Sequence, residues 1–229
     1  MMAEFTVEEV AAKIQHTNVN PDVTRDEIKK LCEDCMEYGF DGVMLQPCWI
    51  KDAKKYLAGS KVKVCTALGY PMGGSTARSK ASEMAEVIEL GADEVDFMPN
   101  IGFLKSGMYD EFEKEVAQIV KAAKGKITKV MLEFGMLTQE EKVKAAELSI
   151  RAGVTYLKNS SGWGKGGKAT VEDVQLLKEV ANNEALVKAS GGIRDFDSAV
   201  AILNAGASLL GTSAGVKIVS GSGEVLSDY

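Results

Sequence analysis

The chain has 229 residues, of which 45% are hydrophobic and 26% are charged, and its formal net charge is −6. This balance is ordinary for a globular protein that can bury a core, and the negative charge argues against a nucleic-acid partner. No apolar run approaches membrane-spanning length, and the first residues lack the pattern of a signal peptide. We therefore expect a cytoplasmic protein without a membrane partner, whose four cysteines are reduced.

Short apolar runs alternate with helical patterns along the chain. A first helix is expected over residues 6–13, where Thr6 and Glu9 have the spacing of a capping box. Further helices are expected over residues 24–38, 50–57, 76–90, 109–124, 138–152, 170–180 and 195–205, before a short final helix. Strands are expected around Ile14, Val43, Val64, Val95, Val130, Leu157, Val187 and Leu209. A glycine-bearing loop is expected over residues 100–107.

Eight short apolar strands that alternate with helices favour a parallel sheet covered on both faces. We predict a single-domain (β/α)8 TIM barrel over residues 1–229, with an extra N-terminal helix and a flexible tail over 221–229. An open doubly wound sheet is the alternative. It is disfavoured because no G-x-G-x-x-G opens a helix after the first strand.

Polar residues stand where the strands are expected to end, which is the face of a barrel that carries active sites. They are Gln15, His16, Gln46, Asp96, Glu133, Lys158, Lys188, Ser190 and residues 211–213. Charged side chains beside a packed core are costly unless they are paired or used in chemistry. These strand ends therefore predict a functional site.

Lys158 and Lys188 end consecutive strands, so they should be neighbours in a barrel. A free lysine has a pKa of about 10.4, and a second ammonium together with partial desolvation favours the neutral amine. A neutral amine can attack a carbonyl and form an imine that accepts electrons, with Asp96 placed to shuttle protons. The alternative is that both lysines only form salt bridges with Asp96 and Glu133.

Two glycine-bearing loops, residues 190–194 and 211–213, follow the seventh and eighth strands. Barrels often bind phosphate there through backbone N–H groups, and Arg194 and Ser213 could add side-chain donors. The alternative is that both loops are ordinary turns that begin helices. His16 is the single histidine and has no carboxylate–histidine cluster beside it, so we expect no metal.

On these residues the chain resembles the deoxyribose-phosphate aldolase family. The motifs are Leu157-Lys158-x-Ser160-x-Gly162, Val187-Lys188-Ala189-Ser190-Gly191-Gly192-Ile193-Arg194 and Asp93-Glu94-Val95-Asp96, with agreement at 63–66, 100–107 and 211–213. The resemblance covers nearly the whole chain. It implies a lyase without a cofactor, a class I Schiff-base aldolase on a (β/α)8 barrel. Such enzymes cleave 2-deoxy-D-ribose 5-phosphate to acetaldehyde and D-glyceraldehyde 3-phosphate, and run the reverse.

The resemblance also implies roles for single residues. Lys158 would form the Schiff base, Lys188 would promote loss of its proton, and Asp96 would act as acid and base with a water. Tyr229 would be a possible proton carrier on the tail. The family tends to form dimers or larger assemblies, so a homo-oligomer, dimer or tetramer, is expected. The phosphate would be bound by Gly162, Gly191, Gly192, Arg194, Gly211 and Ser213.

Several positions depart from the usual family pattern, among them Gln15, Met44, Gln46 and Asn159. Gln15 stands where the family usually has an acid, which removes a negative charge near the second lysine. These departures spare the lysines and surround the substrate. An aldolase of the same chemistry with a different aldehyde or ketone substrate is therefore one alternative, and a non-catalytic phosphate-ligand-binding barrel is another.

Overall fold

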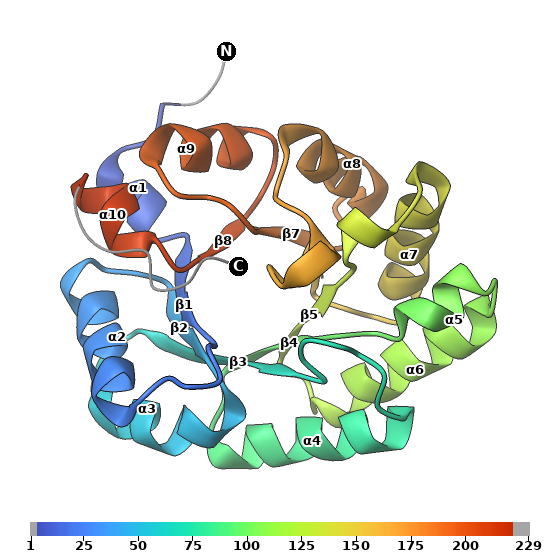
Figure 1. The fold of residues 1–229 in the computed structure, drawn as a ribbon, viewed down its shortest axis with the longest axis horizontal. Helices are drawn as coiled ribbons and strands as arrows, with labels where there is room; N and C mark the ends of the chain where they lie inside the picture. The colour runs from blue at the N-terminus through green and yellow to red at the C-terminus, as the bar shows by residue number, and fades with distance from the viewer. Residues whose placement is uncertain (1–3, 222–229) are drawn as a thin grey trace.

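In the computed structural model, which describes residues 4–221, eight parallel strands close into a barrel with neighbours in chain order. The strands are β1 (Ile14–Asn18), β2 (Gly42–Leu45), β3 (Lys63–Leu68), β4 (Glu94–Phe97), β5 (Ile127–Met131), β6 (Tyr156–Lys158), β7 (Leu186–Ser190) and β8 (Leu209–Thr212). The helices form a ring outside them (Figure 1). The predicted (β/α)8 barrel is confirmed. Tyr229, and all of the expected tail except Gly221, lie outside the described residues.

The helices begin and end close to the positions expected from their caps. They are α1 (Val7–Ala11), α2 (Arg25–Glu37), α3 (Ile50–Tyr56), α4 (Ala77–Leu90), α5 (Ile101–Lys105), α6 (Tyr109–Ala122), α7 (Gln139–Arg151), α8 (Val171–Ala181), α9 (Phe196–Asn204) and α10 (Gly215–Ser220). Short 3-10 turns are η1 (Pro47–Trp49), η2 (Phe134–Met136) and η3 (Gly164–Gly166). Thr6 and Glu9 form the expected capping box at α1, which satisfies backbone N–H groups of the first turn.

Helix α5 lies in the segment that was expected to be a loop. The Asn100 side chain accepts a hydrogen bond from the Phe103 backbone N–H and caps this helix, and Leu104 is buried. The two glycines of the segment hid this signal, because glycine lowers helix propensity by about 1 kcal/mol. The cap and one buried leucine are enough to order a single turn.

The strands separate two kinds of interior. One face of the strands carries mainly aliphatic side chains, such as Val43, Val95 and Val130, which pack in the main core. Successive side chains of a strand point to opposite faces, so the alternate residues point into the barrel. There a small apolar cluster is joined by charged side chains. The apolar members are Val19, Met44, Cys65, Ala67, Met98 and Met131.

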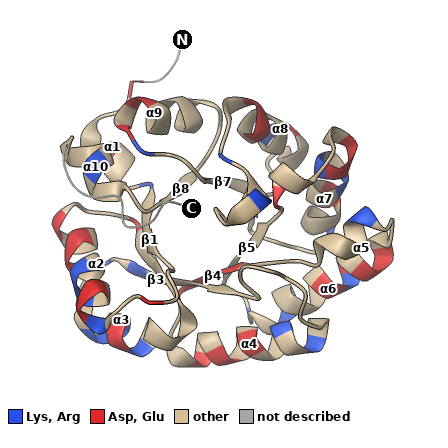
Figure 2. Ribbon diagram, viewed as in Figure 1, with Lys and Arg blue, Asp and Glu red and all other residues tan. Residues whose placement is uncertain are grey.

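Charged residues of both signs are spread over the outer helices, for example α2, α3 and α6 (Figure 2). Several form ion pairs at the surface, such as Lys105 with Glu141 and Arg151 with Glu113. Exposed pairs of this kind contribute little to stability, about 0–1 kcal/mol. The charges inside the barrel are a separate group, and they define the site.

Candidate active site

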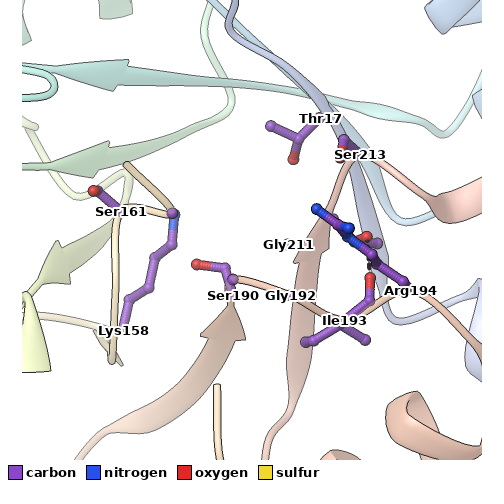
Figure 3. Close-up of a pocket in the computed structure, with 12 residues that line it drawn as sticks. Thr17, Lys158, Ser161, Ser190, Gly192, Ile193, Arg194, Gly211 and Ser213 are labelled. Carbon is purple, nitrogen blue, oxygen red and sulfur yellow. Dashed lines mark hydrogen bonds between the residues drawn. The ribbon is translucent and has the colours of Figure 1, made fainter. Parts of the chain in front are cut away.

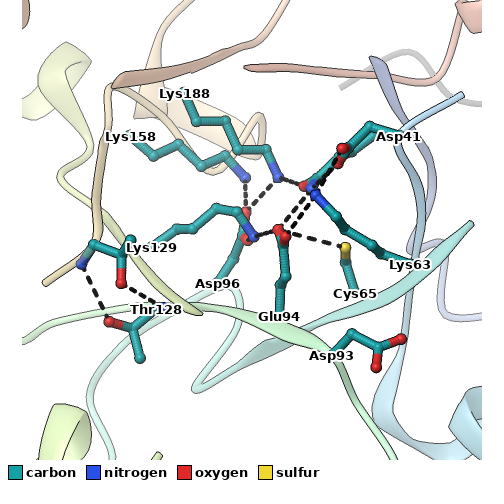
Figure 4. Close-up of polar contacts among 12 residues, drawn as sticks. Asp41, Lys63, Cys65, Asp93, Glu94, Asp96, Thr128, Lys129, Lys158 and Lys188 are labelled. Carbon is teal, nitrogen blue, oxygen red and sulfur yellow. Dashed lines mark hydrogen bonds and ion pairs between the residues drawn. The ribbon is translucent and has the colours of Figure 1, made fainter. Parts of the chain in front are cut away.

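The two lysines singled out by the sequence meet at one carboxylate. Lys158 and Lys188 are partners in the register of β6 and β7. Their Nζ atoms each lie 2.8 Å from Oδ2 of Asp96, which comes from β4 (Figure 4). The two nitrogens therefore cannot be farther apart than twice that distance. Each lysine thus lies within the electrostatic reach of the other.

The three side chains differ in their access to solvent. The Lys188 and Asp96 side chains are 0% exposed, whereas the Lys158 side chain is 7% exposed. Lys158 also lines a pocket above the ends of β6, β7 and β8, whereas Lys188 and Asp96 do not. A ligand in this pocket can therefore touch the Lys158 amine, with Lys188 and Asp96 behind it.

The rest of the pocket wall comes from the loops after β6, β7 and β8, from the last residues of β7 and β8, and from Thr17 of β1. In Figure 3 the Lys158 ammonium and the Arg194 side chain lie on opposite sides of the pocket. The residues that line it are Thr17, Lys158, Ser161, Gly162, Ser190, Gly191, Gly192, Ile193, Arg194, Gly211, Thr212 and Ser213. All six residues expected to bind phosphate are in this list, so the structure brings them together with Lys158.

Two of these glycines leave space that a side chain would fill. Gly191 has φ +100°, and a Cβ atom there would lie 2.7 Å from the carbonyl oxygen of Gly167. A Cβ atom on Gly211 would lie 3.1 Å from Cε of Lys188. Gly191 thus lets two loops pack closely, and Gly211 makes room for the buried lysine.

A second tier of charges lies behind Asp96. Lys129 of β5 is fully buried, and its Nζ lies 3.2 Å from Asp96 Oδ1 and 2.6 Å from Glu94 Oε2. Lys63 of β3 lies 3.0 Å from Glu94 Oε1 and 2.7 Å from Asp41 Oδ1. Ion pairs therefore run without a break from Asp41 to the lysine pair.

Burial and neighbouring charges act in opposite directions on this cluster. Burial alone would raise the pKa of Asp96, but Lys158, Lys188 and Lys129 outweigh it and hold that pKa far below its usual range. The pKa of Lys188 is lowered to about 8, because burial together with the charges of Lys158 and Lys129 outweighs the opposing effect of Asp96. Lys188 is therefore an amine that can lose its proton near neutral pH.

Gln15 lies deeper than expected. It is the second residue of β1 and pairs with Gly42 and Gly211, so it stands inside the barrel and not at a strand end. Its neighbour His16 points the other way, against Phe40, and burial lowers the pKa of His16 to about 4. The prediction that both residues stand at the strand end was wrong, because the strand continues through Asn18.

Glu133 is also placed differently from the expectation. It follows β5 in a left-handed conformation with φ 51°, and burial raises its pKa. Its Oε1 accepts a hydrogen bond from the Ser161 backbone N–H, so Glu133 holds the pocket loop. Both lysines form salt bridges with Asp96, whereas neither forms one with Glu133 among the described residues.

Lys129 is the main site residue that the sequence reasoning missed. It lies in the apolar run Ile127–Met131, where a lysine is out of character for a strand buried on both faces. It precedes Met131, which also points into the barrel, by two positions. Because side chains alternate along a strand, Lys129 points to the same side as Met131. This alternation was the signal in the sequence that Lys129 lies inside the barrel.

The described residues contain no cluster of histidine, cysteine and carboxylate side chains suited to hold a metal ion. No helix between residues 4 and 221 is both long and apolar enough to cross a membrane.

The fold is a parallel barrel, and the site combines a buried lysine pair with a glycine-lined pocket. Together they define the class of protein as a barrel aldolase. The chain belongs to the DeoC/LacD family of aldolases, whose family model matches residues 10–221. The family resemblance found in the sequence is thereby confirmed.

The relatives support this over nearly the full chain. A deoxyribose-phosphate aldolase of Caldanaerobacter subterraneus subsp. tengcongensis is 46% identical over 219 residues, which cover 94% of each chain. One of Brevibacillus brevis is 47% identical over 216 residues, covering 94% of this chain and 97% of the other. A solved structure, titled as a tetrameric deoxyribose phosphate aldolase of Aeropyrum pernix, has a TM-score of 0.87 at 32% identity. It covers 94% of this chain and 91% of that one.

Proposed function

We propose that the protein is a class I aldolase that cleaves 2-deoxy-D-ribose 5-phosphate to acetaldehyde and D-glyceraldehyde 3-phosphate, and catalyses the reverse addition. The observation that carries this proposal is the Lys158 amine in the wall of a pocket that also holds Arg194 and two glycine loops. The activity for which the relatives are named supports the same substrate.

Lys158 is assigned the covalent step because it is the pocket lysine. Its neutral amine adds to the aldehyde carbon C1 and loses water, which leaves an iminium ion. Removal of the proton from the C3 hydroxyl then lets the C2–C3 bond break, and its electrons neutralise the iminium as an enamine. Protonation at C2 and hydrolysis release acetaldehyde and return the amine.

Asp96 and Lys188 are assigned supporting roles behind this amine. Asp96 Oδ2 contacts Lys158 Nζ but does not line the pocket, so any proton that it exchanges with the substrate passes through a water. Lys188 binds the same oxygen and places a second positive charge beside the reacting nitrogen.

The phosphate group is assigned to the far side of the pocket. The planar guanidinium of Arg194 suits a phosphate, and the glycines let backbone N–H groups approach it. The assigned residues are Gly162, Gly191, Gly192, Arg194, Gly211 and Ser213.

Borohydride reduction in the presence of 2-deoxyribose 5-phosphate tests this function. We expect a covalent adduct that peptide mass spectrometry locates on Lys158, and its loss in Lys158→Met. Lys114→Met, on the exposed face of α6, is the matched control and should keep the adduct. A folded wild-type protein that gives no adduct with the sugar phosphate but one with another aldehyde or ketone would assign a different substrate. Phosphate binding without any adduct would identify the non-catalytic binder.

Self-association and cellular location belong to the same proposal. The Aeropyrum pernix relative is described as tetrameric, and we propose a homo-oligomer here as well, which light scattering would test. The cytoplasmic location stays a prediction. Full activity in the presence of a chelator would test the expectation that no metal cofactor takes part.

A further inference from the structure

The charged network inside the barrel is not balanced. Its outermost links join Lys63 to Asp41 at one end and Lys158 and Lys188 to Asp96 at the other. Four lysines and three carboxylates take part, which leaves one positive charge in excess. They are Lys63, Lys129, Lys158, Lys188, Asp41, Glu94 and Asp96.

The neighbouring titratable groups do not supply the missing negative charge. Burial raises the pKa of the Cys65 thiol to about 12, so Cys65 stays neutral. Burial also raises the pKa of Tyr156, whose ring lies 5.8 Å from Lys129 Nζ. Glu133, the buried carboxyl that interacts electrostatically with Lys158, binds the Ser161 backbone N–H, and burial raises its pKa.

Gln15 from β1 occupies the place where a fourth carboxylate would balance the network. Its side chain is fully buried, and its Nε2 donates to Asp41 Oδ2 and Glu94 Oε2, both at 2.9 Å. Its Oε1 accepts from Lys188 Nζ at 2.6 Å. A flipped amide would set oxygen against two carboxylates and NH2 against an ammonium, so chemistry determines its orientation.

We infer that Gln15 is a positioning residue that holds Lys188 with a neutral oxygen. The network is thereby left one carboxylate short, so that Lys188 releases its proton readily. This inference rests on the proposed function, in which Lys188 stands behind the reacting amine. An amide oxygen orients the ammonium as a carboxylate would, but it adds no full negative charge to keep the proton in place. The low pKa of Lys188, about 8, agrees with this arrangement.

The test is the pH profile of kcat/KM for 2-deoxyribose 5-phosphate in Gln15→Glu, which balances the charges. We expect its acid limb to move up by about one to three pH units, the usual effect of a new adjacent charge. Activity at pH 7 should then fall by about tenfold or more and recover at higher pH. Gln15→Met should lower the rate at all pH values without moving the limb upward. Gln118→Glu, on the exposed face of α6, makes the same chemical change outside the network. It should alter neither the rate nor the position of the acid limb.

Lys129→Met provides a second route to balance, because it removes an ammonium from the network. It should also move the acid limb upward, and it covers the case in which Gln15→Glu does not fold. Wild-type profiles superimposed on those of Gln15→Glu or Lys129→Met would overturn the inference. So would an equal upward movement in Gln15→Met.

Denaturant unfolding separates this inference from the proposed function, because it needs no substrate. The folded pKa of Lys188 is about 8 against an ordinary 10.5, so the unfolded state binds more protons between these values. The free energy of unfolding should therefore rise with pH across this window in the wild type. Gln15→Glu should flatten that rise, and Gln118→Glu should not. An unchanged slope in Gln15→Glu overturns the inference even if borohydride trapping succeeds, whereas failed trapping with a flattened slope rejects only the function.

Discussion

Lys158 and Lys188 are neighbours across β6 and β7, and their ammonium nitrogens lie equally far, 2.8 Å, from one carboxylate oxygen. Only Lys158 reaches the pocket, although the side chains of both lysines end at the same carboxylate of Asp96. This difference in access, more than the charge of either lysine, separates the group that touches a substrate from the group that supports it.

The first prediction concerns this division of roles. Lys158→Met should abolish the borohydride adduct and lower kcat/KM by a factor on the order of 10⁴ or more. Lys188→Met should keep the adduct on Lys158 but lower kcat by about 10²–10³-fold, because a charge beside the reacting nitrogen is lost. Peptide mass spectrometry and steady-state kinetics measure both. An adduct on Lys188 in the Lys158→Met variant would reverse the assignment.

The second prediction concerns acid stability. Burial alone would raise the pKa of Glu94, but Lys129, Gln15 and Lys63 outweigh it and lower that pKa from 4.5 to about 2. A carboxylate with a depressed folded pKa stabilises the fold above its unfolded pKa, and this contribution is lost as pH falls toward the folded one. The free energy of unfolding should therefore fall between pH 4.5 and 2.

Glu94→Gln removes this titration, so part of the pH dependence should disappear in the variant. Urea unfolding at a series of pH values measures it, with the exposed Glu8→Gln as control. The pKa lowering would be contradicted if Glu94→Gln and wild type lost stability in parallel through the acid range.

The third prediction concerns the phosphate loops. Gly191→Ala places a Cβ 2.7 Å from the Gly167 carbonyl oxygen at φ +100°, so the two loops must move apart. We expect KM for the sugar phosphate to rise by about tenfold, together with a loss of about 1–3 kcal/mol of stability from backbone strain. Gly125→Ala is the matched control, since Gly125 has φ +85° but nothing within 4 Å of the added Cβ.

The control should lose stability and keep the wild-type KM. Steady-state kinetics and denaturant unfolding separate the two effects. Equal KM values in both alanine variants would show that close approach of the loops at Gly191 does not shape the phosphate site.

The fourth prediction concerns a buried ion pair outside the barrel. Lys80 of α4 is fully buried and lies 3.0 Å from Glu115 of α6, and its Nζ also donates to the carbonyl oxygens of Gly73 and Met98. Lys80→Met leaves the Glu115 carboxylate buried without its partner, which should cost about 3–5 kcal/mol of unfolding free energy.

The double variant Lys80→Met/Glu115→Gln removes the orphaned charge and should recover part of that loss. Denaturant unfolding of the single and double variants measures the difference. A double variant no more stable than Lys80→Met would show that the hydrogen bonds to the loop carbonyls, and not the ion pair, carry the stability.

Local signals account for the elements that were predicted well. Thr6, Thr24 and Thr138 begin their helices with capping boxes, because the bonds of a cap involve residues only three positions apart. The same locality explains the misses. Glu133 is expected at the end of a strand, because nothing nearby in the sequence shows that β5 ends at Met131 and that the chain then enters a left-handed conformation.

The amino-acid sequence by itself determined that strands and helices alternate eight times and that two neighbouring strands each carry a lysine, although Lys188 lies within β7 and not at its end. It also carried the family relationship through its lysine and glycine motifs. Only the tertiary structure decided that Lys63, Glu94, Lys129 and Gln15 join those lysines in one network. A strand that is covered on both faces has no polar side that would show which face points into the barrel. Which side chains point inward therefore depends on how the closed barrel sets the register of its strands.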